Sequence, residues 1–482
     1  MTTGVNFVPV LPEILLLCGA CVVLLGDLFL SDARRHLSFW TTQVVLAAAA
    51  WGALASMQVE PATAFHGMVV DDMLSSTLKF ISCGAVSLML FYSRGYCEAR
   101  GLFRGETFVL TLFALLGMMV MIAAGSFVTL YLGLELLGLS LYAMVAMYRT
   151  SNAATEAAMK YFVLGALASG ILLYGMSMIY GATGSLDIVA VAKALATGQG
   201  NRTILLFGLV FVVSGVAFKL GVVPYHMWVP DVYDGAPTAV TLLIGTAPKL
   251  AAYAFMLRLL GVALGSLWFD WQGMLIVLAV LSMVLGNVVA IAQTSMKRML
   301  AYSSIANMGF MLVGFLAANP NGYSAAMFYT VAYVLTSLAS FGMIMLLSRE
   351  GFEADQLNDF KGLNQRSPWW ALMTLLVMFS LAGVPPTVGF YAKFTVIQAA
   401  VDAGFVWLAV VAVMTSLVGA FYYLRVVKLM YFDDATDMAP IAARADNRAL
   451  LSLNGLALLA FGVLPQPLLG LCVVALANSG LL

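Results

Sequence analysis

Five lysines lie inside long apolar stretches of the chain, where a charged side chain is costly. They are Lys79, Lys160, Lys219, Lys249 and Lys393. One acid, Glu135, lies in the middle of another such stretch, SFVTLYLGLELLGLSLYAMVAMY. The pKa of an amine falls on burial and rises again beside a carboxylate. A lysine and a glutamate in that setting can exchange protons, so these residues predict proton transfer, with a fixed ion pair between two helices as the alternative.

The free-energy cost of placing these lysines in a membrane indicates that they have a function. A lysine at the centre of a membrane helix costs about 2.5–3.5 kcal/mol, so three or four together cost roughly 10 kcal/mol unless each faces a partner or internal water. Lys79 is the exception, because it can snorkel to the interface or pair with Asp72 close by in the sequence. The excess of lysines over buried acids argues against fixed ion pairs throughout.

Two of the apolar stretches are interrupted, and each interruption has a lysine beside it. In the first, Lys219 precedes the segment GVVPYHMWVP, and in the second, FSLAGVPPTVGFYAKF, Lys393 follows the prolines. A proline inside a helix removes a backbone donor. Irregular backbone survives in a bilayer only against protein or a water-filled cavity. We therefore expect water at mid-depth beside Lys219, with His226 as the nearest histidine.

The composition places the whole chain in a membrane. Of its 482 residues, 62% are hydrophobic and only 10% are charged, which is far from the composition of a soluble domain. The 23 basic and 23 acidic residues cancel, so net charge indicates neither a nucleic-acid partner nor an acidic substrate. Cys18 and Cys21 have C-x-x-C spacing but lie in an apolar helix without a second pair, so we interpret them as inert thiols rather than a metal or redox site.

Runs of about 20 apolar residues, the length of a spanning helix, predict an all-α polytopic membrane protein with about fourteen membrane helices in one membrane domain, residues 1–482. They start near residues 9, 38, 70, 106, 126, 155, 202, 237, 271, 300, 322, 368, 405 and 449. The first run is too long for a signal peptide and is expected to be retained. The two interrupted spans are the seventh and the twelfth.

The basic residues of the connections predict the orientation. If the N-terminus is outside, the inside connections hold Arg34, Arg35, Arg94, Arg100, Arg104, Arg149, Lys297, Arg298, Arg349, Lys361, Arg366, Arg425, Lys428, Arg444 and Arg448, and the outside ones hold only Lys193, Arg202 and Arg258. Lysine and arginine of short loops favour the cytoplasmic side. Both termini are therefore expected outside the cytoplasm.

The spacing of the two interruptions, five helices apart, predicts two inverted five-helix repeats of the kind found in transporters. Helices 1–3 would occupy residues 1–105, the first repeat (helices 4–8) residues 106–262, the second repeat (helices 9–13) residues 271–431, and helix 14 residues 449–482. The lysine precedes the break in the first copy and follows it in the second, so the sequence alone does not superimpose them.

Four motifs carry a resemblance to a known family. The segments FKLGVVPYHMWVPDVYDGAPT, QTSMKRMLAYSSIANMGF and LAGVPPTVGFYAKF, together with the glutamate in LGLELLGLSLYAMVA, resemble the antiporter-like, proton-translocating membrane subunits of bacterial respiratory complex I. They cover nearly all of spans 5 to 12 in order. The chain lacks the long lateral helix of the L-type members and has Lys393 where M-type members typically have glutamate, so it most resembles the N-type members.

The resemblance implies a role for each residue. It implies a hydrophilic axis along the membrane plane, in which Glu135 tunes Lys219 on the broken seventh helix, Lys249 relays from the eighth with His226 close by, and Lys393 on the twelfth ends the path. Lys160 would be an accessory charge. In the SSIAHMG motif of relatives, this chain has Asn307, which cannot titrate, so proton passage there would need water or a neighbouring residue.

The resemblance also implies the setting. No cofactor is expected in this chain, whereas NADH, FMN, iron–sulfur clusters and quinone are expected in partner subunits of the membrane and peripheral arms. The chain would lie in the bilayer of the bacterial inner membrane, with both termini periplasmic, and move protons using redox energy from those partners. The alternatives are a subunit of a multi-subunit cation/proton antiporter and a purely structural subunit, in which Lys219→Met would leave pumping intact.

Overall fold

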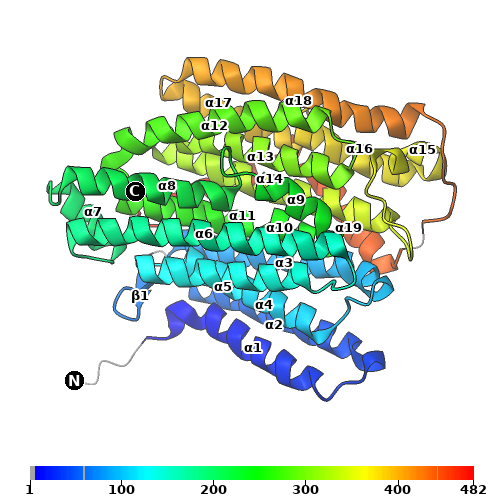
Figure 1. Ribbon diagram of the computed structural model, residues 1–482, viewed down its shortest axis with the longest axis horizontal. Coiled ribbons are helices and arrows are strands. Elements are labelled where there is room, and N and C mark those ends of the chain that lie inside the picture. Colours follow the sequence, from blue (N-terminus) through cyan, green and yellow to red (C-terminus); the bar gives the residue numbers. More distant parts are fainter. Residues whose placement is uncertain (1–5, 58–59, 442, 482) are drawn as a thin grey trace.

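The chain folds into a bundle of long helices. The computed structural model describes residues 6–57, 60–441 and 443–481. Most helices run along the long axis of the molecule, and successive ones alternate in direction (Figure 1). This arrangement satisfies backbone hydrogen bonds within each helix, as a bilayer requires.

The elements of the N-terminal half are η1 (Val8–Val10), α1 (Leu11–Asp27), η2 (Asp32–Arg34), α2 (His36–Ser56), β1 (Ala62–Ala64), β2 (Val69–Asp71), α3 (Met73–Ala99), α4 (Gly105–Ile122), α5 (Phe127–Ala146), α6 (Asn152–Thr183), α7 (Ile188–Ala196), α8 (Arg202–Leu220), α9 (Trp228–Gly235), α10 (Thr238–Gly245), α11 (Ala247–Met256) and the π-helical turn η3 (Leu257–Ala263). The remainder are η4 (Gly265–Leu267), α12 (Trp268–Ile291), α13 (Met296–Phe315), α14 (Pro320–Leu347), η5 (Leu357–Phe360), α15 (Leu363–Arg366), α16 (Pro368–Ala382), α17 (Val388–Asp402), α18 (Val406–Phe432), α19 (Ala445–Val463) and α20 (Gln466–Ala477).

Within the described residues, eleven helical segments are long and apolar enough to cross a membrane, and the pair α19 and α20, bent by 79°, makes up to twelve. The chain is thus a mostly helical, polytopic membrane protein. Two further segments lie at predicted span positions but do not meet that criterion. They are α13, which begins with charged Lys297 and Arg298, and the pair α16 and α17, each of which has 15 residues.

Both predicted interruptions are breaks between helices. Helix α8 ends at Leu220 and α16 ends at Ala382, and each is followed by a glycine in the left-handed conformation, Gly221 at φ 76° and Gly383 at φ 82°. The amides of these glycines bond back to the last turn of their helix, as in a common helix C-terminus. Prolines follow in both breaks, and α9 and α17 then resume.

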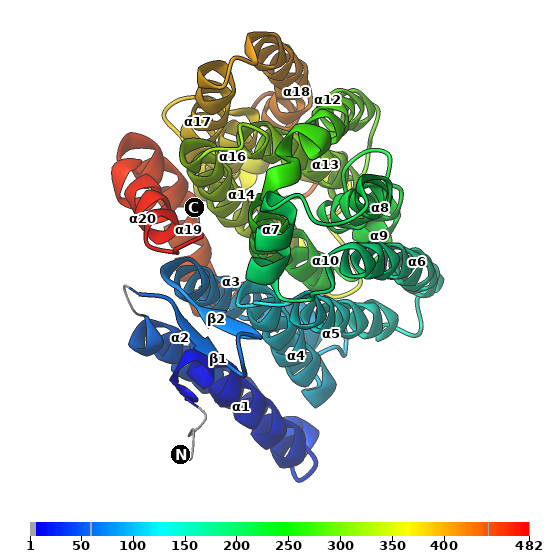
Figure 2. The ribbon, with the colours of Figure 1, turned by 90° about the vertical axis from the view of Figure 1, so that its left-hand side faces the viewer.

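Two central helical segments are buried almost throughout. In the segment 238–263 and in α14, 94% of the apolar window is buried inside the protein. Viewed along the helices, α14 lies between the N-terminal helices and the later helices α13 and α16 (Figure 2). Small residues permit close packing elsewhere: a Cβ on Gly117 of α4 would lie 2.5 Å from the backbone nitrogen of Leu137 on α5.

The all-α fold predicted from the sequence has one short exception among the described residues. The short antiparallel hairpin of β1 and β2 lies between α2 and α3, with Ala62 opposite Asp71. The sequence reasoning also missed α7, a nine-residue helix whose apolar residues Ile188, Val191 and Leu195 are buried. The hairpin, α7 and the start of α1 lie at the same end of the bundle (Figure 1).

Candidate functional site

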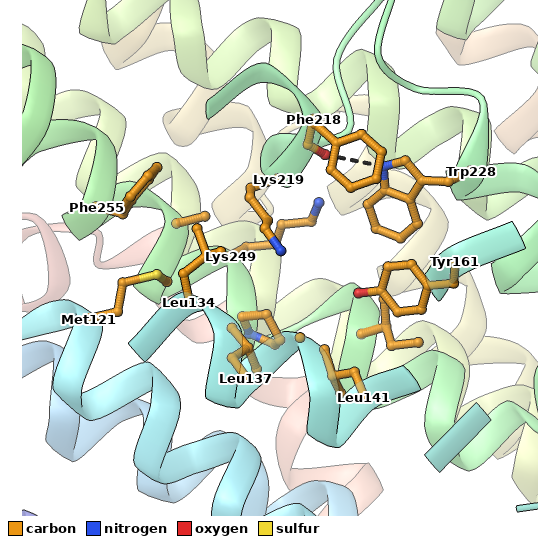
Figure 3. A pocket seen from close by; sticks show the side chains of 14 residues that line it. Met121, Leu134, Leu137, Leu141, Tyr161, Phe218, Lys219, Trp228, Lys249 and Phe255 are labelled. Atoms are coloured by element: carbon orange, nitrogen blue, oxygen red, sulfur yellow. Dashed lines mark hydrogen bonds between the residues drawn. The ribbon is translucent and has the colours of Figure 1, made fainter. Parts of the chain in front are cut away.

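Lys219 and Lys249 line one internal cavity. Lys219 is the next-to-last residue of α8 and Lys249 lies in the first turn of α11, so the helix break brings both side chains into the same space. Figure 3 shows the two ammonium groups between the rings of Phe218 and Trp228 and the leucines of α5. The cavity measures about 30 Å³, enough for about two water molecules.

Glu135 lies on α5 close to this cavity without forming an ion pair there. Its neighbours Leu134, Leu137 and Gly138 line the cavity. Within the described chain, no ion pair at 4.0 Å or less joins Glu135 to Lys219, and one buried carboxylate oxygen of Glu135 has no hydrogen-bond partner. The acid can therefore act on Lys219 at a distance or through water, rather than through a fixed contact.

The ammonium of Lys249 binds the end of the broken helix. Its Nζ donates a hydrogen bond to the carbonyl oxygen of Leu220, the last residue of α8, at 2.8 Å. The last carbonyls of a helix lack partners within the helix and carry partial negative charge. The break therefore creates an acceptor for Lys249 in the interior, where the side chain is only 2% exposed.

Lys393 has the same kind of contact at the second break. Its Nζ donates to the carbonyl oxygen of Ala382, the last residue of α16, at 3.0 Å, and to the hydroxyl of Ser416 on α18 at 2.9 Å. The ammonium also lies 4.8 Å from the ring centroid of Phe310, within the range of a cation–π interaction. At each break, a lysine ammonium thus binds the C-terminal carbonyl of the helix that precedes the break. Lys249 comes from α11, in the next predicted span, whereas Lys393 comes from α17, the second half of the broken span itself.

Asn307 lies in a chain of hydrogen-bonding groups beside Lys393. Lys393, Asn307 and Tyr329 line a cavity of about 10 Å³, close to the space of one water. Asn307 accepts a hydrogen bond from the Tyr329 hydroxyl at 2.6 Å and donates to the carbonyl of Ser303 at 2.8 Å. The Ser303 hydroxyl in turn contacts the hydroxyl of Tyr423 at 2.5 Å. Hydroxyl groups and a water-sized space therefore surround the position where the asparagine departs from the expected histidine.

Comparison with known proteins decides the family. A family profile described as "NADH:quinone oxidoreductase/Mrp antiporter, TM" matches residues 124–419. A curated relative, NADH-quinone oxidoreductase subunit N of Thiobacillus denitrificans, is 60% identical over 98% of this chain and 98% of its own length. The chain belongs to this family of antiporter-like subunits of NADH-quinone oxidoreductase, and to its N-type members.

Solved structures agree with this membership. A chain of respiratory complex I from Thermus thermophilus has a TM-score of 0.82 and 31% identity, covering 95% of this chain and 98% of that chain. A chain of the Mrp complex from Dietzia sp. has a TM-score of 0.84 at 23% identity, covering 98% of this chain and 97% of that one. The second likeness concerns the fold alone. The family resemblance inferred from the motifs is thus confirmed.

Two of the predicted site residues lie apart from the cavities in this family member. Lys160 is 42% exposed and pairs with Glu156 and with Asp231 of α9, both at 2.8 Å. His226 lies in the break after α8, partly buried, and does not line the cavity that holds Lys219 and Lys249. The structure therefore brings Lys219 and Lys249 together, places Glu135 nearby and Lys393 at the second break, and leaves these two residues outside that arrangement.

The sequence reasoning missed two buried ion pairs. Lys79 pairs with Glu13 of α1 at 2.7 Å rather than with Asp72. Asp72 instead pairs with Arg258 at 2.8 Å, and both side chains are at most 2% exposed. The assignment of Arg258 to an outside loop was wrong, because the residue lies in η3 inside the bundle. A signal was available: Glu13 is an acid within the first apolar run, LPEILLL.

Proposed function

We propose that this chain translocates protons across the membrane as a non-redox subunit of a bacterial NADH-quinone oxidoreductase. Its relatives carry that enzyme's name. The observation that carries the proposal is the pair of interior lysines bound to the ends of broken helices, Lys249 on Leu220 and Lys393 on Ala382. A lysine is an efficient carrier here because its ammonium is held by a neutral carbonyl, so loss of the proton leaves no unpaired carboxylate behind.

The proposed path begins at Glu135 and Lys219. A change of charge near Glu135 alters the energy of the Lys219 ammonium, and the proton crosses the shared cavity to Lys249. Water in that cavity supplies the connection, since its volume of about 30 Å³ suffices for about two molecules. The proton then passes to Lys393 and leaves outside, while Lys219 is reloaded from the cytoplasm.

The connection toward Lys393 uses hydroxyl groups. Buried hydroxyl groups lie on the helices between the two breaks, at Tyr233 of α9, Ser304 of α13 and Tyr333 of α14. Tyr333 lines the small cavity that reaches Lys393, together with Asn307. Hydroxyls donate and accept hydrogen bonds at once, so such a series supports proton transfer where no titratable side chain is present. In this proposal His226 and Lys160 have supporting roles toward the cytoplasmic surface.

The proposal includes the topology. Fourteen spans would consist of the eleven clear segments, the pair α19 and α20, α13, and the pair α16 and α17. Residues 106–262 and 271–431 would be inverted repeats, preceded by residues 1–105 and followed by 449–482. The corresponding breaks after α8 and α16 support the repeat. The N and C marks at the same end of the bundle (Figure 1) support termini that both face the same side, and the basic residues of the connections assign that side to the periplasm.

The driving force would come from partner subunits. The relatives of this chain are named as one subunit of NADH-quinone oxidoreductase. On that basis we assign NADH, FMN, iron–sulfur clusters and quinone to the other membrane-arm and peripheral-arm subunits. The chain would receive its signal as a displacement of charge at the boundary with its neighbour in the membrane.

The test is to reconstitute the complete complex with Lys219→Met or Lys393→Met and to compare NADH oxidation with proton pumping. Loss of pumping, with electron transfer lost in parallel when coupling is tight, is expected for both variants. Lys193→Met, which changes an exposed lysine of α7, is the matched control and should retain both activities. Normal pumping by both interior variants would overturn the path.

A cation/proton antiporter is the second candidate, because the matching family description names both classes. The same interior lysines would serve it. Membrane vesicles distinguish the two: an antiporter exchanges cations for protons without NADH or quinone, whereas a complex I subunit moves protons only when quinone is reduced by NADH.

A further inference from the structure

A buried charged cluster lies outside the lysine path, at the end of the bundle that holds the hairpin. It joins the first turn of α1, the end of β2 and the second turn of α3. The Lys79 ammonium contacts the Glu13 carboxylate at 2.7 Å. Lys79 is fully buried and Glu13 is only 8% exposed. Apart from that ammonium, neither carboxylate oxygen of Glu13 has a hydrogen-bond partner among the described residues.

Asp71 is the second acid of the cluster. It is 2% exposed and accepts a hydrogen bond from the Ser76 hydroxyl at 2.8 Å. Ser76, which holds Asp71, and Lys79 lie three residues apart and therefore on one face of α3, so this acid lies on the same face of α3 as the Lys79 ammonium. Burial raises the pKa of the Asp71 carboxyl above its ordinary value, and Lys79 and the hydroxyls of Ser76 and Ser56 offset part of that rise.

The charges of the cluster do not balance. Glu13 and Asp71 supply two negative charges and Lys79 supplies one positive charge. The adjacent Asp72 is neutralised separately by Arg258, at 2.8 Å. With all groups ionised, a net charge of −1 would remain in the interior. An uncompensated buried carboxylate is so costly that such groups bind a proton instead.

A bound proton accounts for this surplus negative charge better than a bound metal cation does. The ammonium of Lys79 already occupies the space against Glu13, and the described residues hold no group of three acidic or metal-binding side chains. The hydroxyl of Ser82, on the same face of α3 as Lys79 by helical spacing, is fully buried and has no hydrogen-bond partner in the described part of the chain. It offers a hydrogen-bonding group toward that face.

We propose that Glu13, Asp71 and Lys79 form a second proton-binding site, which retains one exchangeable proton on one of its two carboxyl groups. The site does not depend on the function of Glu135, Lys219, Lys249 and Lys393. The chain itself links the site to that path. Asp71 directly precedes Asp72, which pairs with Arg258, and Arg258 lies in η3, the continuation of the helix α11 that carries Lys249. A change in protonation at Asp71 can thereby alter the Asp72–Arg258 ion pair, which anchors that helix. Besides the pair of Asp72 and Arg258, a further titratable group near the cluster is Cys83 of α3.

The experiment uses infrared difference spectroscopy of the purified complete complex, comparing H₂O with D₂O. A protonated carboxyl group gives a carbonyl stretching band that shifts on deuteration. We expect one such band to be lost or displaced in Asp71→Asn and in Glu13→Gln. Asp402→Asn, at an exposed position at the end of α17, is the matched control and should leave the band unchanged.

Replacing Lys79, the base of the cluster, tests directly whether the number of protonated carboxyl groups follows the excess of acids over bases. Lys79→Met leaves two buried acids without a base, so a second protonated carboxyl should appear and the band area should increase about twofold. The double variant Glu13→Gln/Lys79→Met again leaves one surplus acid, so a single band should return. This double variant also keeps the test decisive if Lys79→Met fails to assemble, because it has a surplus of one acid, as the unmodified protein does.

Two results would overturn the proposal. One is a band that is unchanged in both Asp71→Asn and Glu13→Gln, which would mean that neither group holds the proton. The other is a band that appears only when sodium is removed, which would mean that a cation balances the charge. Neither result bears on the lysine path, since pumping by Lys219→Met and Lys393→Met is measured separately.

Discussion

Replacing Lys249 by methionine tests whether this lysine stabilises the fold or moves charge. The substitution removes the donor to the Leu220 carbonyl, and leaving a buried acceptor unpaired costs about 1–3 kcal/mol. It also removes a lysine from the membrane interior, which is worth about 2.5–3.5 kcal/mol in the opposite direction. Methionine is unbranched and fills the space of the lysine stem. The two effects nearly cancel, so the free energy of unfolding should change by less than about 2 kcal/mol.

The matched comparison is Lys79→Met. Lys79 neutralises a buried carboxylate at 2.7 Å, and removing one member of a buried ion pair costs about 3–5 kcal/mol because the other charge is left uncompensated. Both substitutions make the same chemical change in an almost fully buried side chain. They differ in whether the partner of the ammonium is a carbonyl or a carboxylate. The difference between their free energies of unfolding therefore measures the effect of the partner's charge.

The assay measures thermal unfolding of the purified complex together with NADH-driven proton uptake in vesicles. For Lys249→Met we expect an unfolding midpoint close to that of the unmodified protein and a loss of proton uptake. For Lys79→Met we expect a clearly lowered midpoint or poor assembly. Equal destabilisation by the two substitutions would refute the reasoning, because it would show that Lys249 holds the fold as firmly as Lys79 does.

Three further substitutions have defined outcomes. Arg258→Met should destabilise the protein by about 3–5 kcal/mol by leaving Asp72 unpaired, and thermal unfolding checks this, with Arg258→Lys expected to recover part of the loss. Ser416→Ala removes one of the hydrogen bonds to the Lys393 ammonium, worth about 0.5–1.5 kcal/mol, and should slow pumping several-fold without affecting assembly. Gly117→Leu should prevent α4 and α5 from packing closely, which a loss of assembled complex on native gels would report.

The features that the sequence predicted well are those with local causes. The breaks after Leu220 and Ala382 follow from glycine and proline at those positions, whose backbone preferences need no tertiary context. The positions of the long helices follow from apolar runs of the length of a bilayer. Membership of the family follows from extended motifs that contain both the glycine and proline breaks and the apolar runs.

The features that were missed depend on contacts between distant residues. Lys249 and Leu220 are 29 positions apart, and the acceptor is a backbone carbonyl that any residue would supply. Asp72 is seven positions from Lys79, yet the partner of Lys79 is Glu13 in another helix. Arg258 was assigned by residue type and position near the end of a span, and residue type does not reveal that its side chain turns into the bundle.

The contrast between carbonyl and carboxylate partners separates two classes of lysine in this fold. Lys249, Lys393 and Lys297 each donate to the carbonyl at the end of a helix, at Leu220, Ala382 and Ala236. A helix C-terminus carries about half an elementary charge, whereas Glu13 offers Lys79 a full one at 2.7 Å. The helix end therefore holds an ammonium less tightly, and a single nearby carboxylate such as Glu135 can shift the balance between the protonated and neutral forms. In the proposed mechanism, a broken membrane helix would therefore do more than admit water: it would supply an acceptor strong enough to keep a lysine in the bilayer and weak enough to let its proton go.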